Sequence, residues 1–208
     1  MGRLVDETEG VAPHAVDESE LDEALKALSS EVLRGEPVPP DLAALWRAQY
    51  ADDVDLLDAY EMVLLEGDDT ADLFSDFTIE NGVEPAIARA FERMTTQVRW
   101  VAEVFGGELL GYWVGDRGER RVADAPVVRC DVEGQFELAG RTLAEALLEG
   151  TDPEDPEDVD DVVKEFRRLD VPCPVDNHDD IYARISSYEE PNSVVLGYVV
   201  EERMREQS

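Results

Sequence analysis

Positive charge is scarce in this sequence. Its 208 residues include 18 lysines and arginines against 51 aspartates and glutamates, which gives a formal net charge of −33 at pH 7. Proteins that bind nucleic acid neutralise phosphates with clustered basic side chains, so this balance argues against nucleic acid as a partner. Lysine occurs only at Lys26 and Lys164. A composition rich in acid and poor in lysine is what we expect of a protein from a salt-adapted, halophilic organism.

Long hydrophobic runs are also missing. No apolar stretch approaches the roughly 20 residues that a membrane-spanning helix needs. The first seven residues turn acidic before an apolar signal-peptide segment can form, so we expect a cytoplasmic protein with no membrane partner. Hydrophobic residues still make up 43% of the chain, which is enough for a core and excludes a disordered acidic polymer.

Cysteine and histidine, the usual residues of metal and thiol sites, occur twice each. Cys130 and Cys173 lie far apart, as free thiols in a reducing compartment do. Potential metal ligands gather only where Cys173, Asp176 and His178 follow one another closely. Because this set lacks a fourth ligand and mixes thiol with carboxylate, we predict a polar loop and no metal site.

Two other patterns resemble ligand-binding motifs without meeting their requirements. The acidic run over residues 152–161 contains Pro153 and Pro156 and no glycine, whereas a calcium loop needs a glycine at its sharp turn. Gly106 and Gly107 lack the strand, turn and helix order of a nucleotide-binding fingerprint. We therefore predict no cofactor, no catalytic residues and no enzymatic activity.

The acid is unevenly distributed along the chain. Residues 1–80 hold 22 acids and 4 bases, residues 81–141 hold 10 and 8, and residues 142–208 hold 19 and 6. A nearly neutral centre therefore lies between two acidic segments. We predict a flexible acidic tail over residues 1–16 and a single domain over residues 17–208.

Hydrophobic periodicity predicts the α+β class, with a mostly antiparallel central sheet over residues 98–139 flanked by helices. Strand-like alternation and intervening turns indicate at least four strands, at residues 98–104, 109–114, 126–130 and 135–139. Helical spacing or capping signals mark residues 19–35, 41–46, 85–94, 142–148 and 156–166. Residues 194–200 are rich in valine and predict a further strand, whereas residues 52–66 fit either a helix or a helix that runs into a strand.

Three aromatic residues alternate with apolar neighbours on the predicted strands. Trp100, Tyr112 and Trp113 serve either core packing or an exposed recognition patch. Tyr112 and Trp113 are adjacent and must face opposite sides of the sheet. One of the two is therefore covered by a helical layer or available to a partner.

The central segment resembles the SUKH superfamily, which includes bacterial toxin-immunity proteins and fungal cell-wall-synthesis regulators. The resemblance covers about residues 37–150, and residues 151–208 form an acidic C-terminal extension to it. It rests on these segments: Pro39-Pro40-Asp41-Leu42, Gly111-Tyr112-Trp113 with the Gly115-Asp116 turn that follows, Ala125-Pro126-Val127-Val128, Asp131-Val132-Glu133-Gly134-Gln135-Phe136, and Leu143-Ala144-Glu145-Ala146-Leu147-Leu148.

The resemblance implies a non-enzymatic protein-binding scaffold that neutralises a cognate toxin. A nuclease toxin carries basic surface for its substrate, and an acidic partner can be steered towards that surface. The expected contact residues are the clustered aspartates Asp52, Asp53, Asp55, Asp58, Asp68, Asp69, Asp152, Asp155, Asp158, Asp160 and Asp161. The alternative is a cytoplasmic regulatory or interaction domain whose acidity is only halophilic adaptation, and the sequence leaves both readings and the oligomeric state open.

Overall fold

The computed structural model describes residues 18–51, 60–65, 74–104, 106–152 and 156–208. Within them, five strands form one antiparallel sheet in the order β1-β2-β3-β4-β5, so that each strand pairs with its neighbours along the chain. The strands are β1 (Val63–Leu64), β2 (Val98–Val104), β3 (Glu108–Trp113), β4 (Val127–Cys130) and β5 (Phe136–Gly140). The predicted α+β class and antiparallel sheet are confirmed, and β1 is an additional short strand at the edge.

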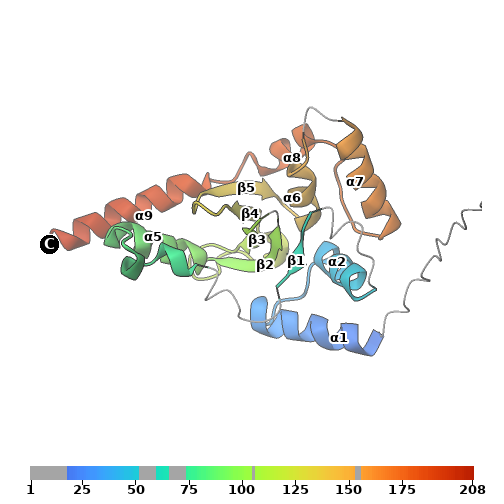
Figure 1. Cartoon of the computed structure of the whole chain (residues 1–208), viewed down its shortest axis with the longest axis horizontal. Helices are drawn as coiled ribbons and strands as arrows, with labels where there is room; N and C mark the ends of the chain where they lie inside the picture. Colours follow the sequence, from blue (N-terminus) through green and yellow to red (C-terminus); the bar gives the residue numbers. More distant parts are fainter. Residues whose placement is uncertain (1–17, 52–59, 66–73, 105, 153–155) are drawn as a thin grey trace, which may run out of the picture.

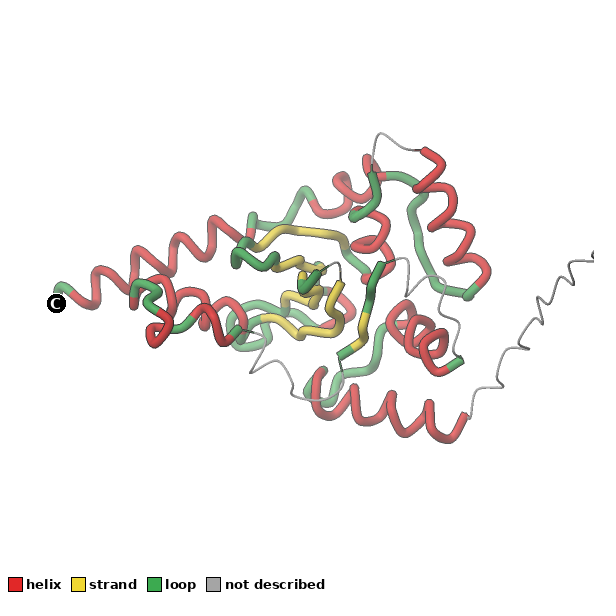
Figure 2. The backbone as a smooth tube through the Cα atoms, viewed as in Figure 1, coloured by secondary structure: helices red, strands yellow, loops and turns green. Residues whose placement is uncertain are grey.

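Helices cover both faces of this sheet (Figures 1 and 2). One face packs against α1 (Glu18–Ala27), the π-helical turn Leu28–Val32, α2 (Pro40–Tyr50) and α6 (Leu143–Glu149). Helix α8 (His178–Ile185) packs against α6 and β5, and α7 (Pro156–Arg168) lies against α6. The other face packs against α5 (Pro85–Thr95) and α9 (Pro191–Glu206).

The core is therefore divided in two by the sheet. Tyr112 belongs to the cluster on the α1, α2 and α6 side, whereas Trp100 and Trp113 belong to the cluster on the α5 and α9 side. All three are buried, so the core-packing interpretation holds and the exposed-patch interpretation is wrong. The predicted opposition of Tyr112 and Trp113 is confirmed, and a helical layer covers each of them.

The N-terminus of α6 forms as its capping signal predicts, with one difference. The backbone N–H of Glu145 donates to the Thr142 hydroxyl at 3.1 Å, as in a capping box. The Glu145 carboxylate accepts from the backbone N–H of Arg141 at 2.8 Å, one residue before the expected partner Thr142. Glu145 is fully buried and also pairs with Arg184 of α8 at 3.0 Å, so the cap links two helices.

The strand expected at residues 194–200 is wrong, because these residues lie within helix α9. Pro191 occupies the first turn of this helix, where its fixed φ and missing N–H are tolerated. Polar contacts hold α9 in place: Arg93 of α5 bonds Glu201 at 2.7 Å, and Gln97, just before β2, donates to the Tyr198 hydroxyl at 2.9 Å. The two helices extend together from one end of the sheet (Figure 1).

Candidate functional site

Four of the aspartates expected to contact a partner lie in described segments. Asp152, Asp158, Asp160 and Asp161 are all exposed, and the last three belong to α7. The other residues of that set lie outside the described residues: Asp52, Asp53, Asp55, Asp58, Asp68, Asp69 and Asp155.

Helix α7 and the beginning of α8 form an acidic surface. Helix α7 buries Val162, Val163 and Phe166, which leaves its polar residues on the outside. An ion pair of 3.1 Å between Arg167 and Asp176 joins the end of α7 to the segment that leads into α8. We define the α7–α8 acidic surface by its exposed aspartates Asp158, Asp160, Asp161, Asp176, Asp179 and Asp180.

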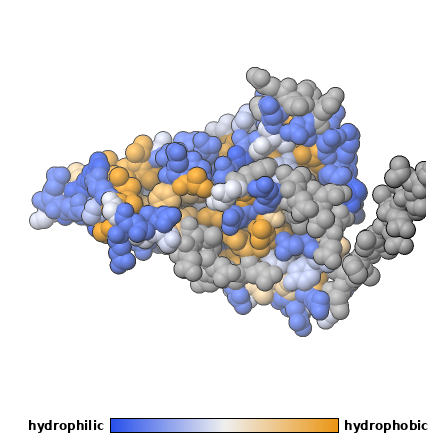
Figure 3. Space-filling model, in the orientation of Figure 1, coloured by the Kyte–Doolittle hydropathy of each residue, from blue (hydrophilic) through white to orange (hydrophobic). Residues whose placement is uncertain are grey.

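The bases on α7 are already paired with acids. Lys164 contacts Asp161 at 2.7 Å, and Arg168 contacts Glu165 at 2.6 Å. Together with Arg167, these are the basic residues of α7. The α7–α8 acidic surface therefore keeps surplus negative charge, and hydrophilic residues dominate this end of the molecule (Figure 3).

The three residues weighed as metal ligands each contact another group. The Cys173 thiol donates to the carbonyl of Val175 at 3.4 Å, and Asp176 pairs with Arg167. His178 is buried, and its Nε2 lies 3.3 Å from the hydroxyl of Thr151. Across the described segments, no group of three histidine, cysteine, aspartate or glutamate residues could hold a metal ion.

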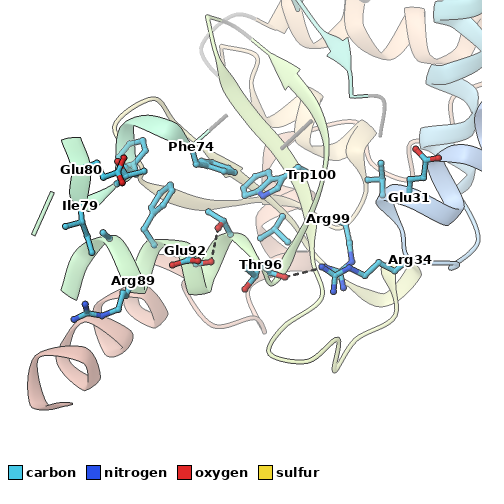
Figure 4. Close-up of a pocket in the computed structure, with 17 residues that line it drawn as sticks. Glu31, Arg34, Phe74, Ile79, Glu80, Arg89, Glu92, Thr96, Arg99 and Trp100 are labelled. Carbon is cyan, nitrogen blue, oxygen red and sulfur yellow. Dashed lines mark hydrogen bonds between the residues drawn. The ribbon is translucent and has the colours of Figure 1, made fainter. Parts of the chain in front are cut away.

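A pocket of about 780 Å³ opens beside the N-terminal half of β2, between the π-helical turn and α5 (Figure 4). Aromatic rings form much of its wall. Phe77 stacks on Phe91 with ring centroids 4.4 Å apart, and Phe74 lies 5.3 Å from Trp100. Such an apolar wall with a few polar groups is typical of small-molecule sites.

Two arginines stand at one end of this pocket, Arg34 just after the π-helical turn and Arg99 on β2 (Figure 4). Arg99 is only 9% exposed and its Nε has no hydrogen-bond partner among the described residues. Its one bond is a long contact of 3.4 Å from an Nη to the carbonyl of Thr96. Burial lowers the pKa of the Arg99 guanidinium, the charge of Arg34 lowers it further, and the charge of Glu36 opposes the shift.

No sequence pattern indicated this pocket. The alternation of β2 places Arg99 opposite the apolar Val98 and Trp100, a pattern that predicts a solvent-facing arginine. The structure buries it because helices cover both faces of the sheet. Arg34 gave no sequence signal beyond its place before Gly35, which ends the helical segment with φ +88° as predicted.

Helix α9 carries a third surface feature. Leu196, Val200 and Met204 recur every four residues and are 65%, 56% and 65% exposed. Hydrophobic residues are visible along the arm that α5 and α9 form (Figure 3).

Comparison of the chain with family models, with curated proteins and with solved structures finds no match. Of the helices in the described segments, none combines the length and the hydropathy that crossing a membrane requires.

Proposed function

We propose that this chain is a non-enzymatic protein-binding scaffold that neutralises a basic, nuclease-type toxin domain, as its resemblance to the SUKH superfamily implies. The observation that carries the proposal is the α7–α8 acidic surface. Its aspartates are exposed, and the bases of α7 are already paired with acids. Asp161 and Asp176 are the partners of Lys164 and Arg167, so the remaining charge of this surface lies on its other four aspartates, Asp158, Asp160, Asp179 and Asp180.

The physical basis is long-range attraction. A surface of one charge sign accelerates encounter with a partner of the opposite sign, and salt screens this effect over about 8 Å at 0.15 M. A nuclease has to present basic residues to its phosphate substrate. Carboxylates that cover those residues would compete directly with nucleic acid, so inhibition requires no catalytic group on this chain.

The test needs the toxin module that this proposal expects in the gene next to that of this chain. The variant Asp158→Asn/Asp160→Asn/Asp161→Asn removes three charges from α7, and Glu20→Gln/Asp22→Asn/Glu23→Gln removes three exposed charges from α1 as a matched control. We expect the α7 variant to associate more slowly and with a weaker dependence on salt, whereas the control keeps the wild-type rate. Equal rates and equal salt dependence for both variants would exclude the α7 aspartates from the contact.

The salt-adaptation alternative draws support from acid on other elements. Glu20, Asp22 and Glu23 on α1 are exposed, as are Glu201 and Glu206 on α9. If acidity serves only salt adaptation, the free energy of unfolding should rise steeply through molar KCl. If it serves a partner, stability should be ordinary near 0.15 M, where surface charges are already screened beyond about 8 Å. Unfolding in urea across a KCl series separates the two outcomes.

A further inference from the structure

Among the described residues, no carboxylate forms an ion pair with the Arg99 guanidinium. The carboxylate of Glu36 acts on this guanidinium through its charge, but it accepts its hydrogen bond from the backbone N–H of Val122 at 2.8 Å. The described residues pair most arginines with carboxylates, for example Arg129 with Glu149 at 3.0 Å and Arg203 with Glu84 at 2.8 Å. Within the described segments no such pair forms at Arg99, although this arginine is nine-tenths buried. Burying a charge without a partner is costly, so an arginine retained in this state indicates a missing anion.

Arg34 places a second positive charge next to Arg99. It is exposed, lines the same pocket and lies close enough to Arg99 for its charge to lower the pKa of that guanidinium. Two like charges side by side repel each other, and an anion between them would remove the repulsion. Planar guanidinium groups bind carboxylates through paired N–H donors, which gives both strength and orientation.

The backbone also holds Arg34 in an unusual position. Its φ of +54° lies in the left-handed region, which is strained for an L-residue other than glycine. The preceding π-helical turn, Leu28–Val32, is a second rare feature of the kind found at functional sites. Together they bring the Arg34 side chain to the mouth of the pocket beside Arg99 (Figure 4).

The other residues that line the pocket indicate an aromatic ligand with one anionic end. Phe74 and Trp100 begin an aromatic wall that Phe77 and Phe91 continue. The indole Nε1 of Trp100 is also buried without a partner among the described residues. The other acidic and basic groups that line the pocket are Glu31, Glu80, Glu92 and Arg89, and Arg89 is already bonded to Glu202 and Glu206. Glu80 and Glu92 lie away from the two arginines, whereas Glu31 lies beside Arg34 (Figure 4). The two guanidinium groups together exceed the charge of Glu31, so the negative end of a ligand is attracted to Arg34 and Arg99.

We propose that this pocket binds a small aromatic carboxylate, whose carboxylate bridges Arg99 and Arg34 and whose ring packs against Phe74 and Trp100. The volume of about 780 Å³ lies within the range of roughly 300–1,000 Å³ for small-molecule sites. This site does not depend on the toxin-binding function, because it lies on the β2 edge and not on the α7–α8 acidic surface.

The first experiment compares indole-3-acetate with its neutral analogue indole-3-acetamide by calorimetric titration of the full chain. We expect saturable binding of the acid and binding of the amide that is at least about tenfold weaker. Arg34→Gln, at an exposed position, should reduce acid binding by a similar factor. Arg121→Gln is the matched control, because Arg121 is exposed and does not line the pocket, and it should bind as the wild type does. Absence of saturable binding to the wild type, or equal binding of acid and amide, would overturn the proposal.

The second experiment uses the Arg99→Met variant and thermal unfolding. Removing an unpartnered buried charge should raise the Tm of the free protein, whereas a purely structural arginine would lower the Tm when replaced. Indole-3-acetate should raise the Tm of the wild type and leave that of Arg99→Met unchanged. An equal ligand-induced shift in both proteins would show that Arg99 does not hold the anion. If Arg99→Met fails to fold, the Arg34→Gln titration decides alone.

Discussion

The carboxylate of Asp41 accepts a hydrogen bond of 2.6 Å from the backbone N–H of Leu143, a residue 102 positions later in the chain. A longer bond of 3.4 Å comes from the N–H of Ala144. Asp41 thus lies in the first turn of α2 and caps the N-terminus of α6. Asp41 is almost fully buried, and this contact joins the N-terminal helices to α6.

Replacing Asp41 should therefore destabilise the fold. Asp41→Ala leaves two buried N–H groups without an acceptor, and we expect the free energy of unfolding to fall by roughly 1–3 kcal/mol. Asp22→Ala, on the exposed side of α1, is the control and should change stability by less than about 0.5 kcal/mol. Urea unfolding at neutral pH measures both, and equal stability of the two variants would contradict the capping role.

Asp41 also predicts a particular dependence of stability on pH. Burial raises the pKa of its carboxyl above the ordinary value, although the bonds from Leu143 and Ala144 oppose the shift. In the unfolded state the pKa of Asp41 is the ordinary aspartate value of about 3.9. The folded state therefore binds this proton more tightly than the unfolded state does. The contribution of the carboxyl is fully present below about pH 3.9 and is lost as pH rises through the folded pKa.

The Asp41→Asn variant isolates this contribution from the titration of the other carboxylates. Its amide oxygen can still accept from the same N–H groups, but it carries no charge. The stability of the wild type relative to Asp41→Asn should decrease as pH rises from about 3.9 towards 7, as linkage requires. A relative stability that increases over this range, measured by urea unfolding at several pH values, would contradict the raised pKa.

The sheet and the local caps were predictable from sequence because their signals are local. Alternation in residues 98–104, turns at glycines and the Thr142 cap each act over a few neighbouring residues, and each was confirmed. The strand expected at residues 194–200 failed because valine favours strands only weakly, and tertiary contacts override that preference. Contacts of Tyr198 and Glu201 with α5 hold these residues in a helix, although Pro191 was an available signal for its start.

The residues of the candidate sites also differ in whether a local sequence pattern reveals them. Asp158, Asp160 and Asp161 were recognisable because charged residues at helical spacing beside buried valines must face outwards. Arg99 was not, because its burial depends on helices distant in the sequence that cover both faces of the sheet. Likewise, no local pattern connects Asp41 with Leu143 across 102 residues.

Gly134 should be intolerant of any side chain. Its φ is +78°, and an added Cβ would lie 2.6 Å from Cε1 of Phe77 and 3.0 Å from Cε2 of Phe91. Gly134→Ala therefore incurs roughly 1–2 kcal/mol for the left-handed backbone and about 1–3 kcal/mol for overpacking against rings of the pocket wall. Gly118→Ala is a matched control, since Gly118 has φ +69° and open space around it. Thermal unfolding should show the larger loss for Gly134→Ala, and equal losses would place Phe77 elsewhere.

Cys130 should be chemically inert in the folded protein. Burial raises the pKa of its thiol to about 12, with a smaller contribution from the carboxylates of Asp131 and Glu108. Only the thiolate reacts, so raising the pKa from its ordinary value of 9.0 to about 12 lowers the reactive fraction about a thousandfold.

The Cys173→Ser variant leaves Cys130 as the single thiol and permits a direct measurement. Its reaction with a coloured aromatic disulfide near pH 8 should be at least about a hundredfold slower in the native state than in urea, where the thiolate population is that of an ordinary cysteine. A native rate close to the rate in urea would mean that the sheet face carrying Trp100 and Cys130 opens readily to solvent. The same rate can be followed across a urea series below the unfolding transition. If Cys130 reacts only through global unfolding, the rate follows the free energy of unfolding, whereas a reaction through local opening does not.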